Sequence, residues 1–98
     1  MYDILRHDHV KKQSYMFIRV ERELYLFRDG SIAYLEHTSN PSKPLLKAHI
    51  PLSAVKRVSR DHDTITLETK NKPYKFFFKS IEKAETYAEL YTFLKSGQ

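Results

Sequence analysis

The lysines are the residues of this sequence that most clearly indicate a binding function. They occur at Lys11 and Lys12, at Lys43, and in the span from Lys70 to Lys79, which contains four lysines and no acid. An ammonium group is a good point charge for a phosphate. The formal net charge of +5 and the isoelectric point near 9.5 also favour anionic partners. Charge alone does not choose among nucleic acids, anionic lipid headgroups and acidic proteins.

The sequence gives weaker indications of a metal site or a catalytic site. His7 and His9 are spaced to share one face of a strand, and that spacing can bind a metal. A metal site needs a third ligand, and no residue of the sequence marks one, so we expect none. The segment Arg60–Asp63 contains an acid and a base but is typical of a turn. Because the sequence has neither a glycine-rich phosphate loop nor a nucleophile signature, we expect no cofactor and no enzymatic activity.

Alternating apolar residues predict a hairpin late in the chain. Residues 64–69 alternate between polar and apolar, and the turn that follows contains Asn71 and Pro73. Residues 74–79 alternate again. One face is expected to hold Tyr74, Phe76 and Phe78, and the other Lys75, Phe77 and Lys79.

A second hairpin is predicted around Asp29-Gly30, which lies between the apolar runs 24–27 and 32–35. Residues 45–52 and 54–58 are typical of two further strands, and residues 37–44 of a loop. The N-terminal stretch, residues 3–22, is also strand-like, but its pattern does not define where strands begin and end.

The period of the pattern changes at the C-terminus. Ser80 is suited to cap a helix, and Lys95 and Gly97 are suited to end it. The apolar residues at helical spacing are Ile81, Ala84, Tyr87, Ala88, Tyr91 and Leu94. One amphipathic helix therefore follows a run of strands, and its apolar stripe needs a partner, such as the open mouth of a barrel.

Composition places the chain among small single domains. Its 98 residues fit one domain, which we assign to residues 1–98. With no cysteine, the chain has no disulfide framework and no thiolate metal site, and it is compatible with a reducing cytosol. No apolar run approaches the ~20 residues that span a bilayer, and Met1-Tyr2-Asp3 begins no signal peptide. We expect a cytoplasmic location.

About seven strands followed by one amphipathic helix is the order of a pleckstrin homology (PH) domain, and local sequence resembles that family over roughly residues 9–95. Residues 23–34 resemble its second and third strands, 50–55 the segment from the fourth strand to the fifth, and 64–79 the sixth and seventh. Tyr87 falls where the family has a nearly invariant Trp. The resemblance implies a mainly β fold, a PH-like seven-stranded antiparallel barrel or sandwich capped by the helix.

The resemblance also implies a function. In many PH domains the loops between strands 1–2, 3–4 and 6–7 share an open end that binds phosphoinositides. Here that implies a module that recruits its host protein to membranes peripherally, through anionic lipid headgroups. The implied headgroup ligands are Lys11, Lys12, Lys43, Lys70, Lys72 and Lys75, with Phe77 and Lys79 as membrane contacts.

One motif departs from the family. Phosphoinositide-binding members usually carry Lys/Arg-x-Arg at the start of strand 2, and here that position aligns with Glu21-Arg22-Glu23. Two acids then occupy key positions. Moving the strand boundary brings Arg19 and Arg22 closer, and the sequence does not decide between these alignments.

A second hypothesis is a protein-interaction module on the same scaffold. It would bind a peptide in the groove between the helix and strand 5, using residues 55–60 and exposed positions of the 81–94 helix. The acids of the strand-2 motif favour this alternative. Nucleic-acid binding is not expected, because no recognition motif is present. Modules of this kind often belong to longer chains, so we expect a larger host protein.

Overall fold

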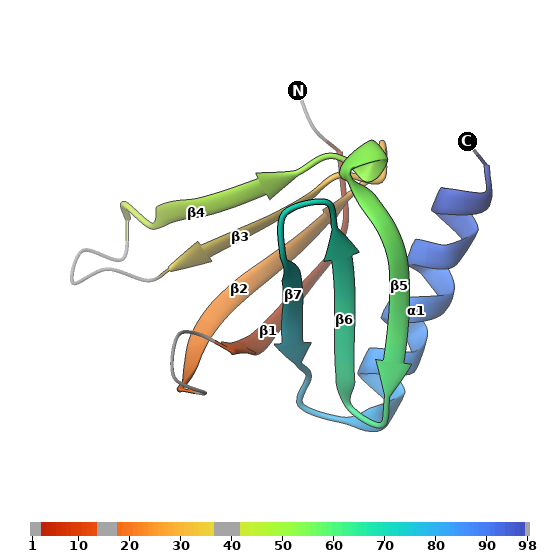
Figure 1. The fold of residues 1–98 in the computed structure, drawn as a ribbon. Coiled ribbons are helices and arrows are strands. Elements are labelled where there is room, and N and C mark those ends of the chain that lie inside the picture. The colour runs from red at the N-terminus through yellow and green to blue at the C-terminus, as the bar shows by residue number, and fades with distance from the viewer. Residues whose placement is uncertain (1–2, 14–17, 37–41, 98) are drawn as a thin grey trace.

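The computed structural model describes residues 3–13, 18–36 and 42–97. Within these residues, antiparallel pairing joins the strands into one sheet of order β4-β3-β2-β1-β7-β6-β5 (Figure 1). The elements are β1 (Ile4–Gln13), β2 (Arg19–Phe27), β3 (Ile32–Glu36), β4 (Leu45–Ile50), the 3₁₀ helix η2 (Leu52–Ala54), β5 (Val55–Asp61), β6 (Thr64–Thr69), β7 (Pro73–Phe77) and α1 (Ile81–Ser96).

The sheet is bent but not closed into a full barrel. In Figure 1, β5, β6 and β7 cross the direction of β2, β3 and β4 at a steep angle, so the two halves form two layers. β4 and β5 are the two edges, and they are not paired in the described residues. α1 packs against β5 and β6, on the open side of the sheet (Figure 1). The predicted mainly β fold with one C-terminal helix is confirmed.

Both predicted hairpins are present. β2 pairs with β3 around the Asp29-Gly30 turn, and β6 pairs with β7. The Asp29 carboxylate accepts hydrogen bonds from the Ser31 amide at 2.8 Å and from its hydroxyl at 2.6 Å. Gly30 has φ of +85° in this turn, a conformation that favours glycine.

Some predicted boundaries were wrong. The strand expected over residues 45–52 ends at Ile50, and Leu52–Ala54 form η2, because Pro51 has no amide hydrogen for the ladder. The last strand ends at Phe77 instead of residue 79. Residues 3–22 contain β1 and the start of β2. The loop expected over residues 37–44 lies partly outside the described residues.

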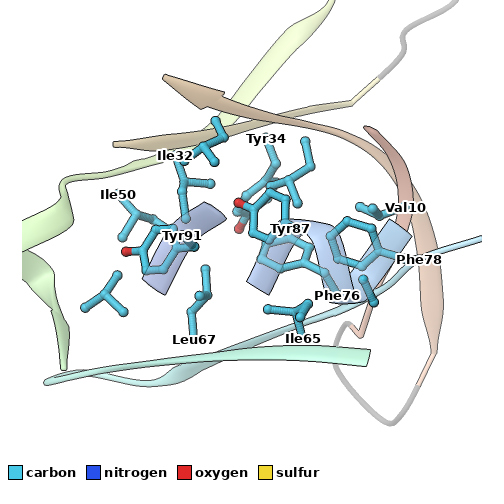
Figure 2. Close-up of a cluster of buried hydrophobic side chains, with 14 of the residues drawn as sticks. Val10, Ile32, Tyr34, Ile50, Ile65, Leu67, Phe76, Phe78, Tyr87 and Tyr91 are labelled. Carbon is cyan, nitrogen blue, oxygen red and sulfur yellow. The ribbon is translucent and has the colours of Figure 1, made fainter. Parts of the chain in front are cut away.

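The core lies between the two halves of the sheet and is sealed by α1. Figure 2 shows Tyr87 and Tyr91 of α1 directed into it, among Phe76, Ile65 and other apolar side chains of the strands. Tyr87 and Tyr91 are fully buried, which confirms the apolar stripe of the helix. Ile81 was wrongly placed in that stripe, because its side chain is half-exposed in the first turn.

The start of α1 also follows the prediction. The Ser80 hydroxyl accepts a hydrogen bond from the Lys83 amide at 3.1 Å, as an N-cap residue does. Neither the length nor the polarity of α1 suits a segment that crosses a membrane, and the described residues contain no other α-helix.

Candidate anion-binding site

Strand register directs Lys12 and Arg22 toward the inner side of the bent sheet. Val10 of β1 lies opposite Arg22 of β2, and Val10 belongs to the buried core. Residues directly opposite each other in an antiparallel pair point to the same face, and side chains alternate along a strand. Arg22 and Lys12 therefore share the face of Val10. They lie near the end of β1 and the start of β2.

Two tyrosine rings flank the Lys12 ammonium. Its Nζ atom lies 5.5 Å from the centroid of the Tyr34 ring and 5.9 Å from that of Tyr74. Lys72 places its own Nζ 5.0 Å from the Tyr74 centroid. These distances are within the range of cation–π attraction. The aromatic faces thus hold two ammonium groups, one from β1 and one from the β6–β7 turn, at one end of the sheet.

Four basic residues converge on this point. The pKa of Lys12 is lowered, first by burial and then by the charges of Lys72, Arg22 and Lys47. We call Lys12, Arg22, Lys47 and Lys72 the inner cationic cluster. Glu36 compensates part of its charge, since its carboxylate lies 3.8 Å from Arg22 Nη1 and 3.5 Å from Lys47 Nζ.

The Arg22 guanidinium is held in place by one hydrogen bond, but not all of its N–H groups have a partner in the part of the chain that the structure describes. Its side chain is only 12% exposed, and its Nη1 donates to the Glu21 carbonyl at 2.7 Å. Its buried Nε makes no hydrogen bond within the described residues. A buried N–H group without a partner is costly, so an acceptor at this position would be favourable.

The acids of the Glu21-Arg22-Glu23 motif do not face this cluster. They alternate with Arg22 along β2 and therefore point to the outer face of the sheet. Glu23 contacts His7 there, with Glu23 Oε1 and His7 Nε2 separated by 2.7 Å. The departure from the family motif thus leaves the inner face basic.

The outer face carries a second group of basic residues. Lys11 lies opposite Phe77 in the β1–β7 pair, and the Arg19 guanidinium carbon lies 3.7 Å from the centroid of the Phe77 ring. Beside them is a hollow of about 630 Å³, which is also lined by Lys79, by Arg22 and by the acids Glu21 and Asp63.

The residues singled out in the sequence therefore fall in different places. Lys12 and Lys72 belong to the inner cationic cluster, whereas Lys11, Phe77 and Lys79 line the outer hollow. Lys75 is exposed on β7, on the face of Phe77. Lys43 and Lys70 are exposed in the segments that precede β4 and follow β6.

Four residues of the site were not among the candidates. Arg22 and Lys47 supply charge, and Tyr34 and Tyr74 supply the aromatic faces. The sequence does contain one signal for Arg22, since it lies two residues before Leu24 and four before Leu26 and therefore shares their buried face.

Several solved structures have the same fold as this chain. The chain superposes with a TM-score of 0.79 on the linker and DH/PH domains of p115-RhoGEF, at 13% identity, covering 99% of this chain and 30% of that one. It superposes at 0.72 on the N-terminal PH domain of human ARAP2, with 20% identity and coverage of 95% and 80%. For the PH domain of TgAPH the values are 0.69, 18%, 90% and 80%.

The chain has the PH-domain fold. No family model and no curated protein sequence matches it. The chain spans less than a third of the length of the first of these structures.

The alternative function predicts a peptide site between β5 and α1, two elements that contact each other in the structure. Val55 is buried, while Lys56, Arg57 and Arg60 of β5 are exposed. Arg60 Nη2 lies 3.6 Å from the Glu85 carboxylate, so an ion pair joins the edge strand to the helix.

This chain also has an apolar surface that was not predicted from its sequence. A groove of about 570 Å³ on the outer face is lined by Ile4, Tyr25, Phe27, Leu46 and other residues of β1 to β4. Ile4 and Leu46 are more than half exposed. The alternation of Tyr25 and Phe27 with buried Leu24 and Leu26 is the signal that could have located it.

Proposed function

We propose that this chain is a binding module, not an enzyme, that recruits its host protein to membranes by binding the phosphorylated headgroup of an anionic lipid in the inner cationic cluster. The observation that supports it is the gathering of Arg22, Lys47 and Lys72 around Lys12, whose pKa is lowered first by burial and then by these three charges. Like charges held together favour a bound anion, and a phosphate would relieve their repulsion.

Each member of the inner cationic cluster has a role in this proposal. Lys12, Lys47 and Lys72 would act as point charges, and the Arg22 fork would donate hydrogen bonds to phosphate oxygens. Tyr34 and Tyr74 would form the wall against which the headgroup lies. Lys43 and Lys70, exposed nearby, would add attraction to the membrane surface.

The charge of the inner cationic cluster alone would give only weak binding to a membrane. Each basic residue near an anionic membrane gains about 1 kcal/mol. Four such residues give about 4 kcal/mol, which corresponds to a dissociation constant of about a millimolar. Tighter binding would require directed hydrogen bonds such as those of Arg22, or multivalent attachment.

The outer group remains a separate prediction. Lys11, Lys75, Phe77 and Lys79 are suited to contact the membrane beside the headgroup. Insertion of Phe77 would require Arg19 to leave its ring, so we propose that these residues contribute mainly charge.

A protein partner along β5 and α1 is the alternative, and it stays a prediction. The proposed function implies a cytoplasmic chain that is peripheral at membranes and belongs to a longer protein. Solved structures with this fold include chains that are much longer than this one.

The proposal can be tested by co-sedimentation with vesicles at two salt concentrations. The vesicles would be neutral or would contain phosphatidylserine, phosphatidic acid or a single phosphoinositide. We would compare the double variant Lys12→Gln/Lys72→Gln, on the inner face, with Lys11→Gln/Lys75→Gln, which removes equal charge from the outer face. At about 1 kcal/mol per lysine, the inner variant should bind ~30-fold more weakly.

The outer-face variant shows whether binding depends on the inner cationic cluster or on the total positive charge of the surface. We expect Lys11→Gln/Lys75→Gln to weaken binding less than the inner variant does, because it removes attraction to the membrane surface but no headgroup contact. We also expect one phosphorylated lipid to be preferred. Equal losses in both variants would contradict a headgroup site in the inner cluster. Absence of binding to every anionic vesicle at low salt would contradict the lipid function and direct attention to protein partners.

A further inference from the structure

Three potential metal ligands meet on the outer face of the β1–β2 hairpin. They are His7, His9 and Glu23, and one ligand atom from each lies within 4.8 Å of the others. Glu23 Oε1 lies 2.7 Å from His7 Nε2 and 3.8 Å from His9 Nδ1. The sequence contained the two imidazoles but did not mark a third ligand, and strand pairing supplies it.

The backbone of the hairpin holds these side chains together. His7 and His9 are two residues apart on β1, so they share a face, and Glu23 of β2 lies directly opposite His9. Tyr25 lies opposite His7, and its ring stacks on the imidazole at 4.3 Å with an interplanar angle of 1°. The stack fixes the plane of the His7 ring, which reduces the ordering that metal binding would require.

The burial of the three groups is graded. The Glu23 side chain is 10% exposed, whereas His7 is 36% and His9 is 59% exposed. An anchored carboxylate with two accessible imidazoles above it leaves an entry path for an ion. It also leaves room for a further ligand on the solvent side.

We propose that His7, His9 and Glu23 bind a divalent transition metal ion, Zn²⁺ being the ion that fits best, with water in the fourth position. Two imidazoles and one carboxylate suit Zn²⁺ better than Mg²⁺ or Ca²⁺, which prefer oxygen ligands. Three protein ligands with an open fourth position is a known zinc arrangement.

The geometry needs only small adjustment. Ligand atoms at about 2.0–2.1 Å from a tetrahedral zinc lie about 3.3 Å from one another. The Glu23–His9 separation of 3.8 Å is slightly larger than that, the Glu23–His7 separation of 2.7 Å is slightly smaller, and the His7–His9 separation is at most 4.8 Å. Rotation of the exposed His9 ring and a small shift of His7 would bring all three to the required distance.

This site is separate from the inner cationic cluster. Glu23 and Arg22 are neighbours on β2 and point to opposite faces of the sheet. The zinc titration and the vesicle assay therefore test two separate proposals, and a negative result in one does not contradict the other.

The test is calorimetric titration of the tag-free protein with Zn²⁺ near neutral pH, in a buffer that does not chelate metals. We would compare wild type with His9→Ala and Glu23→Gln, and with His62→Ala as the matched control. His62 lies on the β5–β6 turn, where its side chain is 80% exposed and contacts Asp61. Nitrogen NMR of the imidazoles would identify which rings respond.

We expect one zinc ion per chain, with changes at the imidazole nitrogens of His7 and His9. Loss of an outer-shell partner typically weakens metal binding by about 10–100-fold, so loss of a direct ligand should weaken it by at least ~10-fold. Because His9 is largely exposed, His9→Ala should fold normally, which far-UV circular dichroism would check.

Three results would overturn the proposal. The first is the absence of saturable binding of one ion per chain by the wild type. The second is wild-type affinity in both His9→Ala and Glu23→Gln. The third is an equal loss in His62→Ala, which would indicate non-specific binding to surface histidines.

Discussion

Lys12 is the residue on which the proposed site depends. Burial and three neighbouring cations all act against its charged form and lower its pKa. The folded protein therefore holds this charge at a cost in stability, whereas the unfolded chain does not. A group that opposes folding and faces a cluster of like charge is typical of a binding site.

Replacement of Lys12 should separate stability from binding. Lys12→Gln removes the repulsion but also the contacts of the ammonium with the Tyr34 and Tyr74 rings. We therefore expect the free energy of unfolding at neutral pH to change by no more than about 0.5 kcal/mol. The same variant should bind anionic vesicles more weakly. Urea unfolding measures the first effect, with Lys56→Gln on exposed β5 as the control. A loss of stability clearly larger than this in Lys12→Gln would show that the lysine is structural.

Tyr87 and Tyr91 fill the space between the layers with large rings. Tyr87 lies 5.1 Å from Phe78 and 6.3 Å from Tyr91, measured between ring centroids. Their buried hydroxyls make no hydrogen bond to the described residues. The rings stabilise the core, but a buried hydroxyl without a partner costs free energy.

Removal of one hydroxyl should therefore stabilise the protein. Tyr87→Phe keeps the ring and is expected to raise the free energy of unfolding by about 1 kcal/mol. Thermal or urea unfolding would measure this, with Tyr74→Phe at a half-buried position as the control. A clear loss of stability in Tyr87→Phe would mean that the hydroxyl has a hydrogen-bond partner.

At the scale of elements, the β2–β3 turn is fixed by backbone geometry and by contact with η2. Gly30 has φ of +85°, and a Cβ atom there would lie 2.6 Å from Leu52 Cδ2. The turn therefore needs glycine both for its conformation and for its space.

The two glycines of the chain should respond differently to alanine. Gly30→Ala should lower the free energy of unfolding by about 1–3 kcal/mol, because it adds both strain and overlap. Gly97→Ala is the control, since Gly97 has a helical φ of −82° and a Cβ there would meet only ordinary contacts. Urea unfolding of both variants would test this, and equal effects would contradict the account of the turn.

At the scale of the whole molecule, buried phenols link stability to alkaline pH. Burial raises the pKa of Tyr87 well above its usual range and raises that of Tyr91 as well. In the unfolded chain both groups ionise near pH 10. The folded state then holds protons that the unfolded state releases, so stability is complete below about pH 10 and falls as the pH rises above it.

This linkage predicts a steep alkaline transition. Above pH ~10 each of the two tyrosines should lower the free energy of unfolding by up to about 1.4 kcal/mol per pH unit. Urea unfolding over a pH series would measure the slope. The double variant Tyr87→Phe/Tyr91→Phe should flatten it, and an unchanged slope would assign the transition to other groups.

The local elements and their order could be predicted from the sequence. Period-2 alternation located β6 and β7, and Asp29-Gly30 between two apolar runs located the β2–β3 hairpin, since each pattern lies within a few residues. Helical spacing likewise predicted Tyr87 and Tyr91 on the buried side of α1. Pro51 suggested an edge position or a strand end, and β4 is an edge strand that ends just before it. The boundary at Phe77 was missed because it depends on where pairing with another strand stops.

Which side chains meet depends on how the strands pair and bend. The register between β1 and β2 turned Arg22 inward and Glu21 outward, and it set Glu23 against His9. The bend of the sheet brought Lys47 of β4 and Lys72 of the β6–β7 turn to Lys12. A one-residue change of register would reverse every one of these faces. Register and bend arise from contacts between distant segments, which no local pattern specifies.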